Sequence, residues 1–153
     1  MKSFISIIIL SIILTSCGFK PIYNSKNSNF QIIEIKNKNE NKNSFLIENI
    51  IMSLSNKEAL RKLKVEIDYN QSITTILKDS KGDPSKKKLS IIVSLEVKNE
   101  KDNVLTNKSF NEEFSYDVQS DKFKMSQYED SITNNLNNKI SNDIIFLLGT
   151  IEW

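Results

Sequence analysis

Alternating apolar and polar residues mark three stretches of the chain as half-buried strands. From Lys62 to Asn70 every second residue is apolar, the pattern recurs from Leu89 to Val97, and five apolar residues from Val104 to Val118 fall on one face. Side chains alternate between the two faces of a sheet with this period. The apolar faces are Leu63, Val65, Ile67 and Tyr69, then Leu89, Ile91, Val93, Leu95 and Val97, then Val104, Phe110, Phe114, Tyr116 and Val118.

Other local signals set the limits of these strands. The β-branched run from Phe30 to Ile35 predicts an earlier strand. The strand at 62–70 either ends there or continues through Leu77. Gly82-Asp83-Pro84 predicts a turn within Asp79–Lys87, and Asn99–Asn103 is a short polar connection. The last three strands should therefore form an antiparallel meander.

Two segments have the spacing of amphipathic helices. In Ser44–Lys57, Leu46, Ile50 and Leu54 recur every four residues, Ile47 and Ile51 widen the stripe, and Asn43 or Ser44 can cap the helix. The second helix begins near Ser126, which forms a capping-box pattern with Glu129, and Gly149 sits where a C-terminal cap belongs. Its apolar stripe is Tyr128, Ile132, Leu136, Ile140, Ile144 and Leu148.

These elements predict an α+β fold in the order β-α-β-β-β-α. A four-stranded, mostly antiparallel sheet offers one apolar face, and both helices should cover it. The first strand reaches the second through a helix, as parallel neighbours require. The expected core places Val65, Ile67, Ile91, Val93, Leu95, Phe114 and Tyr116 beneath Ile50, Ile132, Leu136 and Ile140.

The N-terminus has the layout of a bacterial lipoprotein signal. Lys2 precedes an apolar stretch from Phe4 to Leu14, and Leu14-Thr15-Ser16-Cys17 forms a lipobox. A membrane-spanning or buried core helix is the alternative, but spanning a bilayer takes about 20 apolar residues, and the place behind a Lys fits a signal peptide. We therefore expect cleavage after residue 16 and a lipid on the Cys17 sulfur.

The remaining chain should form one domain on a short tether. Residues 1–16 are the signal peptide, 17–28 the lipidated tether with Pro21, and 29–153 a single domain. Gly18 follows the lipidated residue, where an Asp would favour inner-membrane retention. The expected location is therefore the periplasmic side of the outer membrane, with the lipid on Cys17 as anchor.

Composition excludes several functional classes. The chain has 21 basic and 19 acidic residues and no His, and its one Cys is assigned to the lipid. This near-neutral balance argues against a nucleic-acid partner. Without His or a free Cys, the usual zinc sites and thiol catalysis are absent, and we expect no metal and no cofactor. Ser85 and Lys88 match a Ser-x-x-Lys spacing but lack its companion motifs, so an enzyme is not expected.

Two features remain as candidate binding surfaces. A basic cluster surrounds the turn between the second and third strands and is either a solvated loop tip or a cationic grip on phosphate groups. The run from Ile144 to Leu148 is apolar on all sides and is either a buried helix end or a contact for a partner. The cluster consists of Lys78, Lys81, Lys86, Lys87 and Lys88.

The start of the mature chain resembles a known family. Cys17-Gly18-Phe19-Lys20-Pro21-Ile22-Tyr23 is similar to the opening of the LptE family of lipopolysaccharide-assembly lipoproteins, especially its alphaproteobacterial forms. The β-α-β-β-β-α order also agrees with the LptE fold. The match covers about seven positions by residue and the whole mature chain by architecture.

The resemblance implies a non-enzymatic outer-membrane lipoprotein. Its partner would be a β-barrel of the LptD type, which it plugs and helps to assemble while lipopolysaccharide passes to the outer leaflet. It also implies lipopolysaccharide binding through basic residues near Lys78–Lys88, although Arg, the bidentate binder of phosphate, is nearly absent. The alternative is an auxiliary binding lipoprotein of another envelope lipid-transport system.

Overall fold

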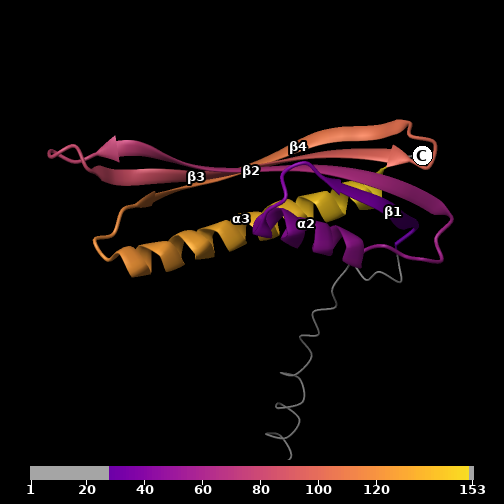
Figure 1. The fold of residues 1–153 in the computed structure, drawn as a ribbon, viewed down its shortest axis with the longest axis horizontal. Helices are drawn as coiled ribbons and strands as arrows, with labels where there is room; N and C mark the ends of the chain where they lie inside the picture. Colours follow the sequence, from indigo (N-terminus) through magenta and orange to yellow (C-terminus); the bar gives the residue numbers. More distant parts are fainter. Residues whose placement is uncertain (1–27, 152–153) are drawn as a thin grey trace, which may run out of the picture.

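The fold is a four-stranded sheet with two helices on one face. A computed structural model describes residues 28–151, so the signal peptide, Cys17 and all but the last residue of the tether lie outside the described part. Figure 1 shows both helices beneath the sheet. The elements are β1 (Phe30–Asn37), α2 (Lys42–Ser53), β2 (Arg61–Lys78), β3 (Pro84–Asn99), β4 (Val104–Asp117) and α3 (Lys122–Thr150).

The strand order β1-β2-β3-β4 confirms the predicted topology. β1 pairs with β2 in parallel, with α2 as the crossover, whereas β2, β3 and β4 form the antiparallel meander. The longer alternative for β2 is correct, since the strand runs to Lys78. β1 is short, however, and its pairing ends where Asn37 lies opposite Ile67.

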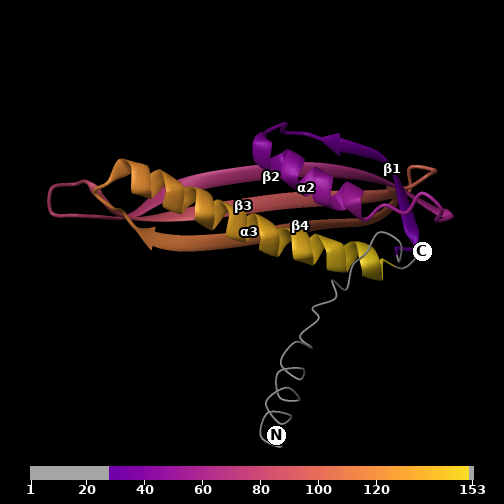
Figure 2. The ribbon, with the colours of Figure 1, turned by 90° about the horizontal axis from the view of Figure 1, so that it is seen from below.

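The short β1 divides the sheet into two halves. We call β2 residues 61–69 and the strand segments paired with them the proximal half, and β2 residues 70–78 with their paired segments the distal half. In the proximal half every second residue of β2 is buried, and in the distal half all of β2 is exposed. Figure 2 shows the hairpin of the distal half reaching beyond both helices.

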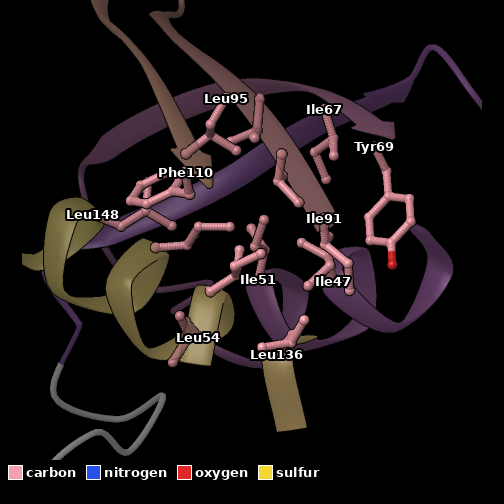
Figure 3. Close-up of a cluster of buried hydrophobic side chains, with 14 of the residues drawn as sticks. Ile47, Ile51, Leu54, Ile67, Tyr69, Ile91, Leu95, Phe110, Leu136 and Leu148 are labelled. Atoms are coloured by element: carbon pink, nitrogen blue, oxygen red, sulfur yellow. The ribbon is translucent and has the colours of Figure 1, made fainter. Parts of the chain in front are cut away.

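The core lies between the sheet and the helices. Ile67, Ile91 and Leu95 are fully buried, as predicted, and Figure 3 shows them facing Ile47 and Ile51 of α2. Leu136 and Leu148 of α3 complete the same cluster. The predicted burial of Val65, Val93, Tyr116, Ile132 and Ile140 is also confirmed.

The buried stripe of α2 differs from the expected one. Ile47, Ile51 and Leu54 are buried, while Ile50 is only half-buried and Leu46 is exposed. The two stripes are neighbours on the same helix and are about equally apolar, so spacing alone did not separate them. The helix also starts earlier, because the Asn41 side chain accepts hydrogen bonds from Asn43 N and Ser44 N and forms a capping box with Ser44.

The expected ends of α3 were wrong. Asp121, not Ser126, caps the helix, and its side chain accepts hydrogen bonds from Phe123 N at 3.0 Å and Lys124 N at 3.1 Å. At the other end Gly149 lies inside the helix, which continues to Thr150. Asp and Ser are comparable caps, so the earlier residue takes the role once packing permits another turn.

Phe114 is a further correction. It shares a face with Phe110 and Tyr116, yet 45% of it is exposed while those two are buried. α3 crosses the sheet obliquely (Figure 2) and does not cover β4 evenly along its length. Phe114 therefore stays partly in contact with water, although the strand alternation places it on the face that carries the core.

Candidate functional site

The candidate site is the hairpin of the distal half, which carries the basic cluster. Its turn is shorter than predicted and comprises only Asp79–Asp83, because β2 ends at Lys78 and β3 begins at Pro84. The Asp79 side chain accepts hydrogen bonds from the backbone N–H groups of Lys81 and Asp83, both at 2.9 Å. Gly82 has φ of +89°, a left-handed conformation that glycine adopts without steric cost. The turn is thus fixed by its own side chain and backbone.

The five lysines of the cluster do not share one surface. Only Lys81 lies in the turn, Lys78 ends β2, and Lys86, Lys87 and Lys88 belong to β3. The predicted turn range included Lys86 and Lys87, and this was wrong, because β3 already begins at Pro84. Successive strand residues point to opposite faces, so Lys87 lies on the helix-covered face and its two neighbours on the open face.

Lys87 is held by groups of the core boundary. Its Nζ lies 3.5 Å from the Glu129 carboxylate of α3, and the Tyr116 hydroxyl donates to the same carboxylate at 2.7 Å. Burial raises the pKa of Tyr116 above its ordinary value, and the hydrogen bond to Glu129 raises it further. Tyr116 also meets Tyr128 edge to face. Lys87 therefore serves the attachment of α3 more than a ligand.

The other lysines differ in how far they are neutralised. Lys88 lies 3.0 Å from Glu113 of β4, and Lys86 lies opposite Asp117 in the strand register. Within residues 28–151, Lys78, Lys81 and Lys86 make no ion pair. These three ammonium groups are the part of the cluster that could contact an anionic group such as a phosphate.

The apolar end of α3 is divided between core and solvent. Ile144 and Leu148 are buried, Ile145 and Leu147 are half-buried, and Phe146 is 62% exposed. The helix end therefore belongs to the core, as the first alternative predicted, and one aromatic side chain is left on the surface, so a partner contact there stays a prediction.

One polar feature was not recognised from the sequence. An open depression of about 500 Å³ is lined by Asn39, Asn41, Lys42, Asn43, Tyr69, Asn70 and Gln71. The hydroxyl of Tyr69 donates to Asn137 Oδ1 at 3.1 Å, and burial raises the pKa of Tyr69 to about 12. The only sequence signal was the Asn-rich loop, which reads as a solvated loop. Its neutral amides have hydrogen-bonding capacity but no acid–base chemistry.

The described residues give no support for catalysis or metal binding. Ser85 and Lys88 stand three positions apart on one strand and point to opposite faces, so they cannot act together. Between residues 28 and 151 no three potential metal ligands lie close enough to hold an ion. In the same range no helix is long and apolar enough to cross a bilayer.

Comparison by sequence finds no match to any family model or curated protein. Comparison by structure is informative. Rare lipoprotein B from Shewanella oneidensis matches with a TM-score of 0.58 and 10% identity, over 77% of this chain and 92% of that one. A minor lipoprotein from Acinetobacter baumannii matches with a TM-score of 0.61 and 8% identity, over 80% and 92%.

A third solved structure agrees with these. Lipoprotein B from Nitrosomonas europaea matches with a TM-score of 0.59 and 9% identity, over 86% of this chain and 90% of that one. The matches extend over nearly the full length of the other proteins, so the whole domain is compared. The chain therefore has the fold of the rare lipoprotein B structures, which is the LptE-type architecture implied by its N-terminal resemblance.

Proposed function

We propose that this chain is an outer-membrane lipoprotein that plugs and assembles an LptD-like β-barrel for lipopolysaccharide insertion. The observation that carries the proposal is the combination of the Cys17–Tyr23 opening with the fold of rare lipoprotein B over most of the chain. The lipid on Cys17 would hold the domain on the periplasmic side of the outer membrane. No reaction is catalysed, and the domain acts through its surfaces.

The distal half supplies a contact surface for such a role. Its hairpin tip projects beyond both helices, and the Asp79 side chain accepts two backbone hydrogen bonds within the turn. Lys78, Lys81 and Lys86 could contact lipopolysaccharide phosphates as point charges, without the bidentate geometry of Arg. Contacts of this kind are weakened by salt where they are exposed.

The decisive experiment is purification of the full-length lipoprotein from detergent-solubilised outer membrane. We expect a large β-barrel to co-purify with it, identified by mass spectrometry. Mass spectrometry of the mature N-terminus should show a lipid-modified Cys17. An unmodified Cys17, or a preparation without any barrel, would contradict the proposal.

A charge-reversal pair tests the basic surface. Replacing Lys78 and Lys81 by Glu should lower lipopolysaccharide binding, while the circular dichroism spectrum stays unchanged. The matched control replaces by Glu two exposed lysines that lie outside the hairpin turn, Lys42 on α2 and Lys108 on β4, and it should bind as the parent does. Equal binding by both variants would leave the hairpin as a solvated tip.

The second candidate is an auxiliary binding lipoprotein of another envelope lipid-transport system. The open depression beside Tyr69 is the feature that favours it, since its amides could bind a polar headgroup. Co-purification with an inner-membrane transporter instead of a barrel would support this alternative.

A further inference from the structure

We infer that the end of the domain from which the tether leaves is a second contact with the bilayer, besides the lipid on Cys17. This anchor end comprises the start of β1, the Asn56–Leu60 connection, the Asn99–Val104 connection and the last turns of α3. The inference rests on the lipidation of Cys17, which is part of the proposed function. It does not depend on the barrel partner.

The tether joins the fold beside the Asn56–Leu60 connection. The Asn56 backbone N–H donates to the Phe30 carbonyl at 3.0 Å, and its side-chain amide donates to the Ser28 carbonyl at the same distance. Phe30 also lies opposite Arg61 in the parallel register, so Leu60 is next to the point where the tether arrives. Figures 1 and 2 agree that α3 ends at this same end of the molecule.

The anchor end exposes large apolar side chains from three separate segments. Leu60 is 97% exposed, Phe146 is 62% exposed and Val104 is 54% exposed. A single exposed apolar residue is ordinary on a protein surface. Three of them lie at the end where the tether joins the fold, and acyl chains could cover them there.

The charges of the anchor end suit an anionic bilayer surface. Among the described residues, two of its three carboxylates are neutralised from within, since Lys62 pairs with Glu100 at 3.0 Å and Lys64 with Asp102 at 2.7 Å. Glu58, the third, makes no ion pair in this part of the chain. Lys57 and Lys101 are exposed and make no ion pair within residues 28–151. Anionic lipid headgroups attract such lysines near the membrane surface.

The length of the tether decides which end of the domain the bilayer can cover. Leu77 and Phe123 are exposed near the opposite end, so apolar exposure alone would not choose between the ends. From Cys17 to Ser28 there are about 11 residues, which span at most roughly 40 Å when extended. β2 has 18 residues and is about 60 Å long. The tether therefore keeps the anchor end near the lipid.

The test uses single tryptophans in the full-length lipoprotein reconstituted in vesicles. Trp153 is the chain's only Trp and is first replaced by Phe. Leu60→Trp then reports on the anchor end, and Leu77→Trp, an equally conservative change at an exposed site near the hairpin tip, is the matched control. The vesicles contain phosphatidylethanolamine and phosphatidylglycerol, with acyl chains brominated or not, and flotation first establishes that the protein is bound.

We expect brominated chains to quench Leu60→Trp at least twofold and to leave Leu77→Trp unchanged. Floating protein with an unquenched Leu60→Trp would overturn the inference alone and leave the lipid anchor intact. Equal quenching at both sites would also overturn it, because the domain would then lie flat. Protein that fails to float would overturn the anchor itself, and the inference with it, whereas barrel co-purification tests the proposed function separately.

Discussion

The proximal and distal halves of the sheet are built from the same strands but differ in what covers them. In β2 the proximal half buries Leu63, Val65, Ile67 and Tyr69, whereas the distal half leaves Ile73, Ile76 and Leu77 exposed. Both stretches are rich in apolar residues. The difference arises because β1 and α2 end at the boundary between them. Burial is therefore set by the covering elements, and the strand pattern only makes burial possible.

The strongest test of this difference in burial is to replace one isoleucine by alanine in each half of β2. Ile67 is fully buried and Ile73 is 43% exposed, and both lie on the same face of the same strand. Ile67→Ala should reduce the free energy of unfolding by about 2–5 kcal/mol, because it leaves a cavity in the core. Ile73→Ala should cost about 1 kcal/mol or less, since much of its surface already meets water.

Urea denaturation followed by circular dichroism measures both variants. Similar losses would mean that the distal half is covered in solution, for example by another copy of the chain. Repeating the measurement at several protein concentrations separates that case, because association makes the midpoint depend on concentration.

Tyr69 stands at the boundary between the halves and gives the next largest effect. Tyr69→Phe removes the hydroxyl that donates to Asn137, and the buried Asn137 amide already has an unpartnered Nδ2 among the described residues. The expected loss is about 1–2 kcal/mol of unfolding free energy. Urea denaturation at pH 7 checks it, and an unchanged midpoint would show that water satisfies the group.

The same residue gives a pH signature. The pKa of Tyr69 is about 12 in the folded chain against an ordinary 10. Above pH 10 the unfolded chain loses this proton while the folded chain keeps it, so stability is full below pH 10 and falls as the pH rises toward 12. Tyr69→Phe should show a shallower fall, the remainder coming from Tyr116 and from lysines. Parallel curves for parent and variant would contradict the assignment.

The N-terminal caps of the two helices allow a further comparison, because α2 begins near the boundary between the halves and α3 begins beside the distal half. Asn41→Ala and Asp121→Ala should each cost about 1 kcal/mol, because each removes an acceptor for two backbone N–H groups. Asp121→Asn keeps the acceptor and serves as the control. If Asp121→Ala proves neutral in urea denaturation while Ser126→Ala does not, the helix begins where the sequence first suggested.

The smallest effect on stability is expected for an ion pair on the face of the proximal half that the helices do not cover. Lys38 lies 2.6 Å from Glu66, and this hydrogen bond lowers the pKa of Glu66. The stabilisation that this pair gives the folded chain is fully present above the ordinary Glu pKa. It is lost as the pH falls through the lowered pKa of Glu66. Glu66→Gln should therefore change stability only slightly at pH 7, as exposed pairs do, and by even less at pH 3. A larger difference at pH 3 than at pH 7 would contradict the sign.

The sequence predicted the fold because its periods were long and unambiguous. Strict alternation through Leu63–Tyr69 and Leu89–Val97 could be satisfied only by strands with one buried face. The errors occurred where two local solutions had similar energies. Asp121 and Ser126 are both good caps, and Leu46–Ile50 and Ile47–Ile51 are neighbouring stripes on one helix. Tertiary packing decides between such alternatives, and no single-chain pattern contains it.

The candidate site was predictable only by region. The Gly82 turn indicated where the basic residues gather, but strand alternation separates Lys87 from Lys86 and Lys88. The partners that neutralise them, Glu129 and Glu113, come from elements far along the chain. The Asn-rich depression carried no chemical motif at all. The clustering of lysines in the sequence therefore indicated where the site lies. Which of those lysines keep an unpaired charge depends on the fold.

The position of α3 after β2, β3 and β4 in the chain bears on how the protein is made. Its 29 residues supply Ile132, Leu136, Ile140, Ile144 and Leu148, which cover the apolar face of the meander. β2, β3 and β4 precede α3 in the chain, so during synthesis they are complete before it, and only α2 is then available to cover part of their apolar face. Nascent chains that stop short of Lys122 would present paired strands with an open hydrophobic side, the kind of species that aggregates. Productive biogenesis therefore depends on how soon α3 follows the three strands, or on a chaperone that shields the sheet until it does.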